Sequence, residues 1–186
     1  MKKNYILVSV LVVVVAAVAL IYFRPKEKVD TQIVVKDYKN TTYTINGEPV
    51  TLVNGVSGTT RYFGNEVKHD LNDDGKEDVA FLLTQDNEGS GVFYYVVAAL
   101  QTDTGYKGSH EFLLGDRIAP QSTNIDEGMT SAGTNRQNVI VVNYAVRLPG
   151  EPFTTAPSVG KSVWIKLDPE TMQFGEVAHD FEGESR

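Results

Sequence analysis

Short apolar runs alternate with turn-forming residues along most of this 186-residue chain, and this alternation limits what it can fold into. Turn signals recur at close spacing, for example at Asn46-Gly47, Asn54-Gly55 and Pro149-Gly150. The intervening runs are rich in β-branched and aromatic residues and lie at 41–45, 50–53, 79–83, 92–100, 139–144 and 162–167. No segment after Phe23 sustains a helical period. The pattern predicts an all-β fold, a single antiparallel β-sandwich or barrel-like domain at 41–178.

The first residues have a different character. Residues 1–4 include two lysines, and a run without charge follows at residues 5–23. At about 1.5 Å per residue, a helix of this length just spans a hydrocarbon core of about 30 Å. We therefore expect a cytoplasmic N-terminus, a single transmembrane anchor at 5–23 and a linker at 24–40, with the domain outside the cytoplasm. The alternative is a signal peptide cleaved near Ala19, which would release a secreted protein.

The remainder of the chain is acidic and lacks cysteine. Residues 1–28 hold five of the 17 basic residues and one of the 24 acidic ones, which leaves 12 against 23 and a net charge of −11. Such a surface repels nucleic acid, so no nucleic-acid partner is expected. The absence of cysteine excludes disulfides, a thiol nucleophile and a zinc–thiolate site. The last residues, 179–186, form an acidic tail.

Nine residues, Asp70-Leu71-Asn72-Asp73-Asp74-Gly75-Lys76-Glu77-Asp78, carry the most recognisable chemistry. Oxygen-bearing side chains stand at the first, third, fifth and ninth positions, and glycine stands at the sixth. Calcium takes about six to eight oxygen ligands, and alternate side chains converge when the backbone curls around an ion. The predicted ligands are Asp70, Asn72, Asp74, the carbonyl of Lys76 and Asp78. The twelfth position is Phe81, so the helix–loop–helix calcium hand, which needs glutamate there, is excluded.

The alternative interpretation of this loop is an Asx-rich turn in which Asp and Asn cap their own backbone. Five carboxylates within nine residues would repel one another without a cation, and this favours calcium. The loop resembles those of integrin-type β-propeller repeats, dockerins and thrombospondin type 3 repeats, which share the Asp-x-Asn/Asp-x-Asp-Gly-x-x-Asp core. The resemblance implies a structural ion, here one that fixes the start of the strand expected at 79–83.

Catalytic motifs are not evident in the sequence. The three histidines, His69, His110 and His179, do not stand at metal-ligand spacing from one another, and no nucleophile elbow or phosphate-binding loop is present. Two stretches instead place charge within apolar, turn-forming sequence, and their charged residues are Asp116, Arg117, Arg147 and Glu151. At the mouth of a barrel they could orient a polar or acidic ligand. The alternative is a structural ion pair that closes the loop ends.

A wider resemblance rests on Thr51-Leu52-Val53-Asn54-Gly55, on residues 70–85 and 89–96, on Leu114-Gly115-Asp116-Arg117-Ile118-Ala119-Pro120-Gln121 and on Pro149-Gly150-Glu151-Pro152. Over about residues 43–177 the chain resembles a group of small, uncharacterised bacterial proteins that are exported or anchored in the membrane. The resemblance implies an envelope setting and implies no activity.

Two functions are compatible with these features. The favoured one is a non-enzymatic module of the bacterial envelope, anchored in the membrane, with a structural calcium loop and a β surface for another protein or a glycan. It predicts an exposed aromatic patch, around Tyr94, Tyr95 or Trp164. The alternative is a small β-barrel ligand-binding protein or enzyme, which predicts that Asp116, Arg117, Arg147 and Glu151 converge in a pocket.

Overall fold

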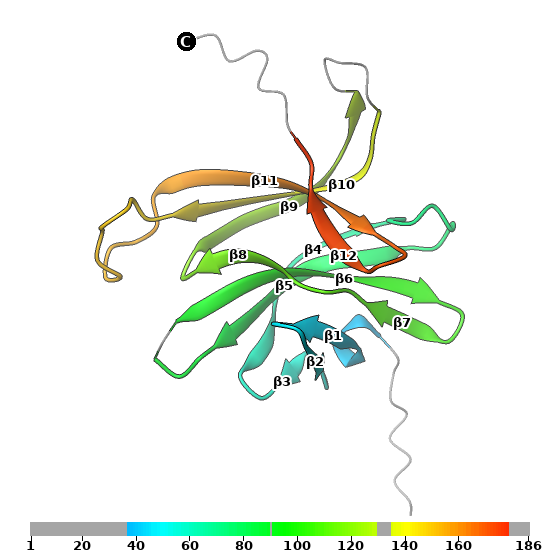
Figure 1. Ribbon diagram of the computed structural model, residues 1–186, viewed down its shortest axis with the longest axis horizontal. Helices are drawn as coiled ribbons and strands as arrows, with labels where there is room; N and C mark the ends of the chain where they lie inside the picture. Colours follow the sequence, from blue (N-terminus) through cyan, green and yellow to red (C-terminus); the bar gives the residue numbers. More distant parts are fainter. Residues whose placement is uncertain (1–36, 90, 130–134, 179–186) are drawn as a thin grey trace, which may run out of the picture. The chain divides into compact units, whose positions relative to one another are not determined.

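The computed structural model describes residues 37–89, 91–129 and 135–178 (Figure 1). The expected anchor at 5–23, most of the expected linker and the acidic tail lie outside the described residues, so those expectations stay predictions. Within the described part of the chain, no helix is long and apolar enough to cross a membrane.

The described residues form an all-β structure, as the sequence pattern predicted. One 3-10 helix, η1 (Tyr38–Asn40), precedes twelve strands. The strands are β1 (Thr42–Ile45), β2 (Glu48–Thr51), β3 (Val56–Ser57), β4 (Thr60–His69), β5 (Asp78–Asp86), β6 (Val92–Thr102), β7 (Gly105–Gly108), β8 (Phe112–Asp116), β9 (Ala119–Met129), β10 (Asn135–Val146), β11 (Val159–Asp168) and β12 (Gln173–Glu176). All pairings between these strands are antiparallel.

The strands form three layers (Figure 1). A six-stranded sheet has the order β3-β4-β5-β6-β7, with β8 also paired to β6, and a four-stranded sheet has the order β12-β11-β10-β9. One face of the six-stranded sheet packs on the four-stranded sheet across a core that contains Leu82, Val96 and Ile140. Its other face is covered by the β1–β2 hairpin, which buries Tyr43 and Ile45. The predicted sandwich is therefore present, with an added hairpin layer.

Strands β5 and β6 lie between the two cores, which explains their continuous apolar sequence. Successive side chains of a strand point to opposite faces, so a strand covered on both sides needs apolar residues at every position. Residues 80–83 are all fully buried: Ala80 and Leu82 face the four-stranded sheet, and Phe81 and Leu83 face the hairpin. Full burial of one such large side chain stabilises the fold by about 1.5–3 kcal/mol.

Five strands, β3, β4, β7, β8 and β9, were not predicted from the sequence. Gly64-Asn65 resembles a turn, but in the structure it interrupts β4 as an irregularity in its pairing with β5. Gly64 has φ +119° and Asn65 φ +52°, backbone angles that bend the strand without ending it. Strand β9 is mostly polar, and its hydrogen-bonded partner β10 holds it in the sheet. Tertiary pairing thus decides what local propensity leaves undetermined.

Residues 37–40, the described part of the segment 24–40 that the sequence assigned to a linker, pack on the domain. The Asp37 carboxylate accepts a hydrogen bond from the Lys39 backbone N–H (2.8 Å) and thereby caps η1. The Tyr38 ring lies 5.5 Å from the ring of Phe81, and its carbonyl accepts a hydrogen bond from the Tyr43 hydroxyl (2.6 Å). These contacts fix η1 on the hairpin side of the six-stranded sheet.

Candidate functional site

The acidic loop joins two paired strands. Strand β4 ends at His69, strand β5 begins at Asp78, and these two residues are partners in the ladder. The strand expected at 79–83 follows the loop, as the sequence predicted, and β4, which it did not predict, precedes the loop. Gly75 adopts φ +82°, the left-handed angle that the sharp turn at the sixth position requires.

Inside the loop, side-chain oxygens accept hydrogen bonds from the loop's own backbone. The Asp74 N–H donates to Asp70 Oδ1 (3.0 Å) and to Asn72 Oδ1 (3.2 Å), and the Gly75 N–H donates to Asp70 Oδ2 (2.7 Å). Partial desolvation raises the pKa of Asp70, but these backbone N–H groups outweigh it and hold the pKa below its usual value. The Asp70 and Asn72 oxygens thus meet at one N–H on the inner side of the loop.

Asp78 fastens the loop to the sheet. Its side chain is fully buried, with Oδ2 accepting from the Leu71 N–H (2.9 Å) and Oδ1 from the Gln101 N–H at the end of β6 (2.7 Å). Burial raises the pKa of Asp78, the charges of Asp74 and Asp70 add to the rise, and the two backbone N–H groups oppose it. A single carboxylate therefore links the beginning of the loop, the first residue of β5 and the end of β6.

Lys76 and His69 connect the loop to its surroundings. The Lys76 ammonium lies 2.7 Å from the Asp103 carboxylate in the turn between β6 and β7. His69 Nε2 lies 2.8 Å from Glu127 Oε1 of β9 and 3.0 Å from Asn138 Oδ1 of β10. The loop is thus attached to the six-stranded sheet on one side and, through its preceding residue, to the four-stranded sheet.

The loop's internal hydrogen bonds are those of an Asx-rich turn, which was the alternative interpretation of the sequence. Among residues 37–89, 91–129 and 135–178, no group of three His, Asp or Glu side chains is arranged to hold a metal ion. All five predicted ligands offer hard oxygen atoms, the donor type that calcium prefers. The chemistry of the donor set therefore fits calcium, and the ion itself stays a prediction.

Of the four residues in the second predicted group, the structure brings three together: Asp116, Arg117 and Arg147. Asp116 Oδ2 lies 2.7 Å from the Arg117 guanidinium, and Asp116 Oδ1 accepts from the Val92 N–H (2.8 Å). Arg147 donates to the carbonyl oxygens of Arg117 (2.8 Å), Phe153 (3.2 Å) and Thr155. These contacts join the β8–β9 turn to the β10–β11 connection.

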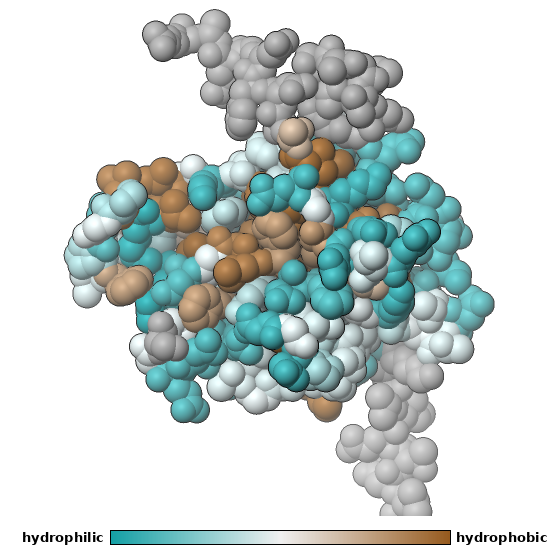
Figure 2. Space-filling model, in the orientation of Figure 1, coloured by the Kyte–Doolittle hydropathy of each residue, from teal (hydrophilic) through white to brown (hydrophobic). Residues whose placement is uncertain are grey.

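Glu151 has a separate, local role: its Oε2 accepts from the Leu148 N–H (2.8 Å) within the β10–β11 connection. The Phe153 ring stacks on the Arg117 guanidinium, 4.3 Å away, while 66% of Phe153 is exposed. Figure 2 shows apolar residues gathered over this connection, where Leu148 is also exposed. Phe153 and Phe63 are thus both exposed among the described residues, and the Phe63 ring lies 5.3 Å from the ring of Tyr94, one of the residues that the sequence suggested. Tyr95, which the sequence also suggested, is buried in the hairpin core.

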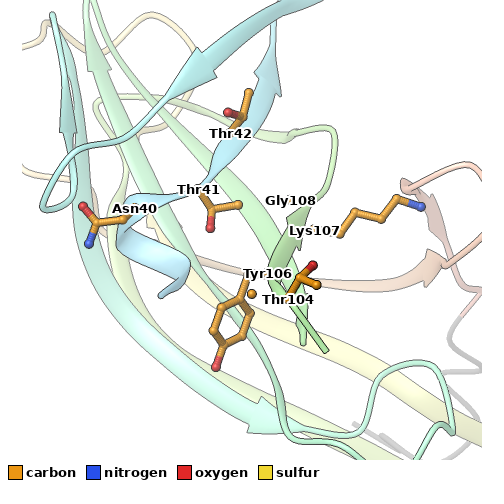
Figure 3. Close-up of a pocket in the computed structure, with 8 residues that line it drawn as sticks. Asn40, Thr41, Thr42, Thr104, Tyr106, Lys107 and Gly108 are labelled. Atoms are coloured by element: carbon orange, nitrogen blue, oxygen red, sulfur yellow. The ribbon is translucent and has the colours of Figure 1, made fainter. Parts of the chain in front are cut away.

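A cleft that sequence reasoning missed lies between the start of β1 and the β6–β7 hairpin (Figure 3). Its lining comes from Asn40, Thr41 and Thr42 on one side and from residues 104–108 on the other. The two walls are more than sixty residues apart along the chain, so no local sequence motif could indicate that they form a cleft. The sequence marks only one part of this lining: Thr41 and Thr42 begin the run at 41–45 that was predicted to be a strand.

Comparisons with known proteins do not extend this description. The chain matches no protein-family model, and neither curated protein sequences nor solved structures give a significant match.

Proposed function

We propose that this chain is a non-enzymatic binding module of a bacterial envelope, anchored in the membrane by residues 5–23, with a calcium ion that stabilises its 70–78 loop. The uncharged run at 5–23 supports the anchor, because it has the length and composition of a membrane-spanning helix. The observation that carries the calcium proposal is the position of Asp78, buried at the point where the acidic loop meets β5 and β6.

Electrostatics supports a cation at this loop. Asp70 and Asp74 lie close enough to Asp78 for their charges to raise its pKa. Repulsion among carboxylates opposes folding of the loop, and a divalent cation removes that cost. Asp70, Asn72, Asp74, the Lys76 carbonyl and Asp78 would hold the ion. Bound calcium would supply positive charge and coordination that fix the loop, while Asp78 transmits this order to β5 and β6.

The Arg117 region supports the binding-module interpretation over the ligand-site alternative. The Arg147 guanidinium donates to three backbone carbonyls, and Asp116 accepts from Val92 and Arg117. Glu151 caps its own loop. These side chains are engaged in holding the β8–β9 turn and the β10–β11 connection together. A ligand at the same groups would have to displace those contacts.

Thermal unfolding of the full chain in detergent tests the calcium proposal. A site of the weak extracellular class, with Kd on the order of 10⁻⁵ to 10⁻³ M, adds about 1–4 kcal/mol at about 5 mM calcium. For a chain of this size, we expect Tm to be roughly 3–12 °C higher with calcium than with chelator. A Tm that neither calcium nor chelator moves would contradict the proposal.

Two substitutions make this test specific. Asp74→Asn removes one predicted ligand charge, so we expect the calcium-dependent rise in Tm to be lost or greatly reduced. Asp168→Asn is the matched control, because Asp168 also caps a turn, accepting from the Glu170 N–H (2.9 Å), but lies between β11 and β12. The control variant should keep the full calcium response even if its baseline Tm is lower.

A further inference from the structure

The cleft between β1 and the β6–β7 hairpin has the size of a small-molecule site. Its volume is about 460 Å³, within the range of about 300–1,000 Å³ typical of ligand pockets. In Figure 3, η1 and the start of β1 form one wall and β7 forms the other. A pocket of this volume accommodates a group of about the size of a disaccharide.

The walls are held close together by the backbone. At Gly108, a Cβ atom would lie 2.2 Å from the carbonyl oxygen of Thr42 and 2.8 Å from Cδ1 of Tyr43. Only glycine permits this approach, so β7 and β1 meet at the end of the cleft. The wall of β1 is also fixed, since the Thr41 hydroxyl donates to the Asp37 carbonyl (2.8 Å) and the Thr42 hydroxyl lies 2.7 Å from the Thr51 hydroxyl. The cleft is therefore built by packed backbone.

The lining is polar and nearly uncharged. The side chains of Thr41, Thr42 and Thr104 supply hydroxyl groups. The Thr41 hydroxyl already donates to Asp37, and those of Thr42 and Thr104 lie 2.7 Å and 3.5 Å from the hydroxyls of Thr51 and Thr102. A hydroxyl oxygen has two lone pairs, so each keeps the capacity to accept a hydrogen bond from a ligand. Tyr106 adds an aromatic ring with a hydroxyl at its end. The described lining residues include no carboxylate, in a domain that is otherwise rich in them, and the one ammonium, on Lys107, extends away from η1 in Figure 3.

This lining selects the chemistry of its ligand. An apolar ligand would bury these hydroxyl oxygens without satisfying their remaining capacity to accept hydrogen bonds, which is unfavourable. An anion or cation would find no opposite charge directed into the cleft. A sugar offers many hydroxyl groups together with apolar C–H faces that can lie on the ring of Tyr106. We propose that this cleft binds a saccharide unit of an uncharged glycan.

The inference deepens the proposed function, because it assigns a ligand class and a site to the binding module. It depends on the module binding a glycan, and none of the residues that line the cleft is a predicted calcium ligand. Calcium-dependent melting and saccharide binding are separate measurements, so either proposal can fail while the other stands.

Isothermal titration of the full chain in detergent with four tetrasaccharides tests the proposal. Cellotetraose, maltotetraose and chitotetraose are uncharged and differ in linkage and in acetamide groups, whereas tetragalacturonate is anionic. We expect at least one uncharged probe to bind and tetragalacturonate to bind at least tenfold more weakly. Absence of binding by all three uncharged probes, or a preference for the anionic probe, would overturn the proposal.

Variants locate any binding that is found. Thr42→Val and Thr104→Val keep the size of the side chain and remove its hydroxyl, so each should weaken binding by about five- to tenfold. Thr154→Val is the matched control, because Thr154 is exposed in the β10–β11 connection. Lys107→Gln should change binding less than twofold if the ligand is uncharged. Binding that survives both cleft variants unchanged would place the saccharide elsewhere and overturn the assignment.

Discussion

The carboxylate of Glu66 on β4 interacts with three hydrogen-bond donors. Its Oε1 accepts from the hydroxyls of Tyr38 (2.7 Å) and Tyr62, and the Lys39 ammonium lies 3.5 Å away. Lys39 also lies over the Tyr62 ring, 4.0 Å from its centre. Burial raises the pKa of Glu66, but the two hydroxyl groups and Lys39 outweigh it and lower the pKa below its usual value. This group ties η1 to β4.

Glu66→Gln should therefore destabilise the fold in a pH-dependent way. A carboxyl whose pKa is lowered by folding stabilises the protein above its unfolded-state pKa, and the contribution disappears as the pH falls through the folded-state value. Because the side chain is 27% exposed and partly screened by solvent, we expect a loss of about 0.5–1 kcal/mol at pH 7 that shrinks below about pH 4. Urea unfolding at several pH values measures this difference.

The control for this variant is Glu48→Gln, at an exposed position on β2. It should change the free energy of unfolding by less than about 0.5 kcal/mol at every pH. An equal loss of stability for Glu66→Gln at pH 7 and at pH 3 would contradict a contribution from the ionised carboxylate.

The sequence predicts the role of an individual residue where that residue contacts backbone close to it along the chain. The spacing of the acidic loop predicts both the left-handed backbone angle of Gly75 and the direction of the Asp70 side chain, which points toward the loop's own backbone. The link from Asp78 to Gln101 was not readable, because it joins positions that meet only when β5 pairs with β6. The burial of Tyr95 was missed for the same reason: its face is decided by the β1–β2 hairpin, which covers it.

Among the elements, the β10–β11 connection depends on Arg147. A planar guanidinium can donate to several carbonyls at fixed angles, and lysine cannot reproduce this geometry. Arg147→Lys should lower the free energy of unfolding by about 1–2 kcal/mol and speed amide hydrogen exchange in residues 148–158. Mass-spectrometric hydrogen exchange together with urea unfolding measures both effects. Arg61→Lys, at an exposed position on β4, is the matched control and should leave exchange in 148–158 unchanged.

Strand prediction succeeded where burial is two-sided and failed where pairing alone makes the strand. The apolar runs of β5 and β6 were evident because both faces are covered. The polar β9 is a strand because it pairs with β10. Sequence patterns report burial, and β9 buries too little to be recognised in this way.

For the whole molecule, the absence of cysteine permits a direct test of topology. A single cysteine introduced as Ser158→Cys lies at an exposed position in the β10–β11 connection. In intact bacterial cells, we expect a membrane-impermeant maleimide to label this variant and the labelled chain to remain in the membrane fraction. A cysteine at Lys3→Cys, on the expected cytoplasmic side, should react only after the cells are opened. The reverse labelling pattern would contradict the proposed orientation.

The two oxygens of Asp78 also have a consequence beyond the loop. One of them holds the end of β6, from which the chain turns directly into β7 and the saccharide-sized cleft. If the proposed ion orders the loop, the same carboxylate also restrains this wall of the cleft, and thermodynamic reciprocity requires any such influence to be mutual. In that case the proposed glycan would bind more weakly where divalent ions are scarce, and a domain with glycan bound would lose the proposed ion more slowly.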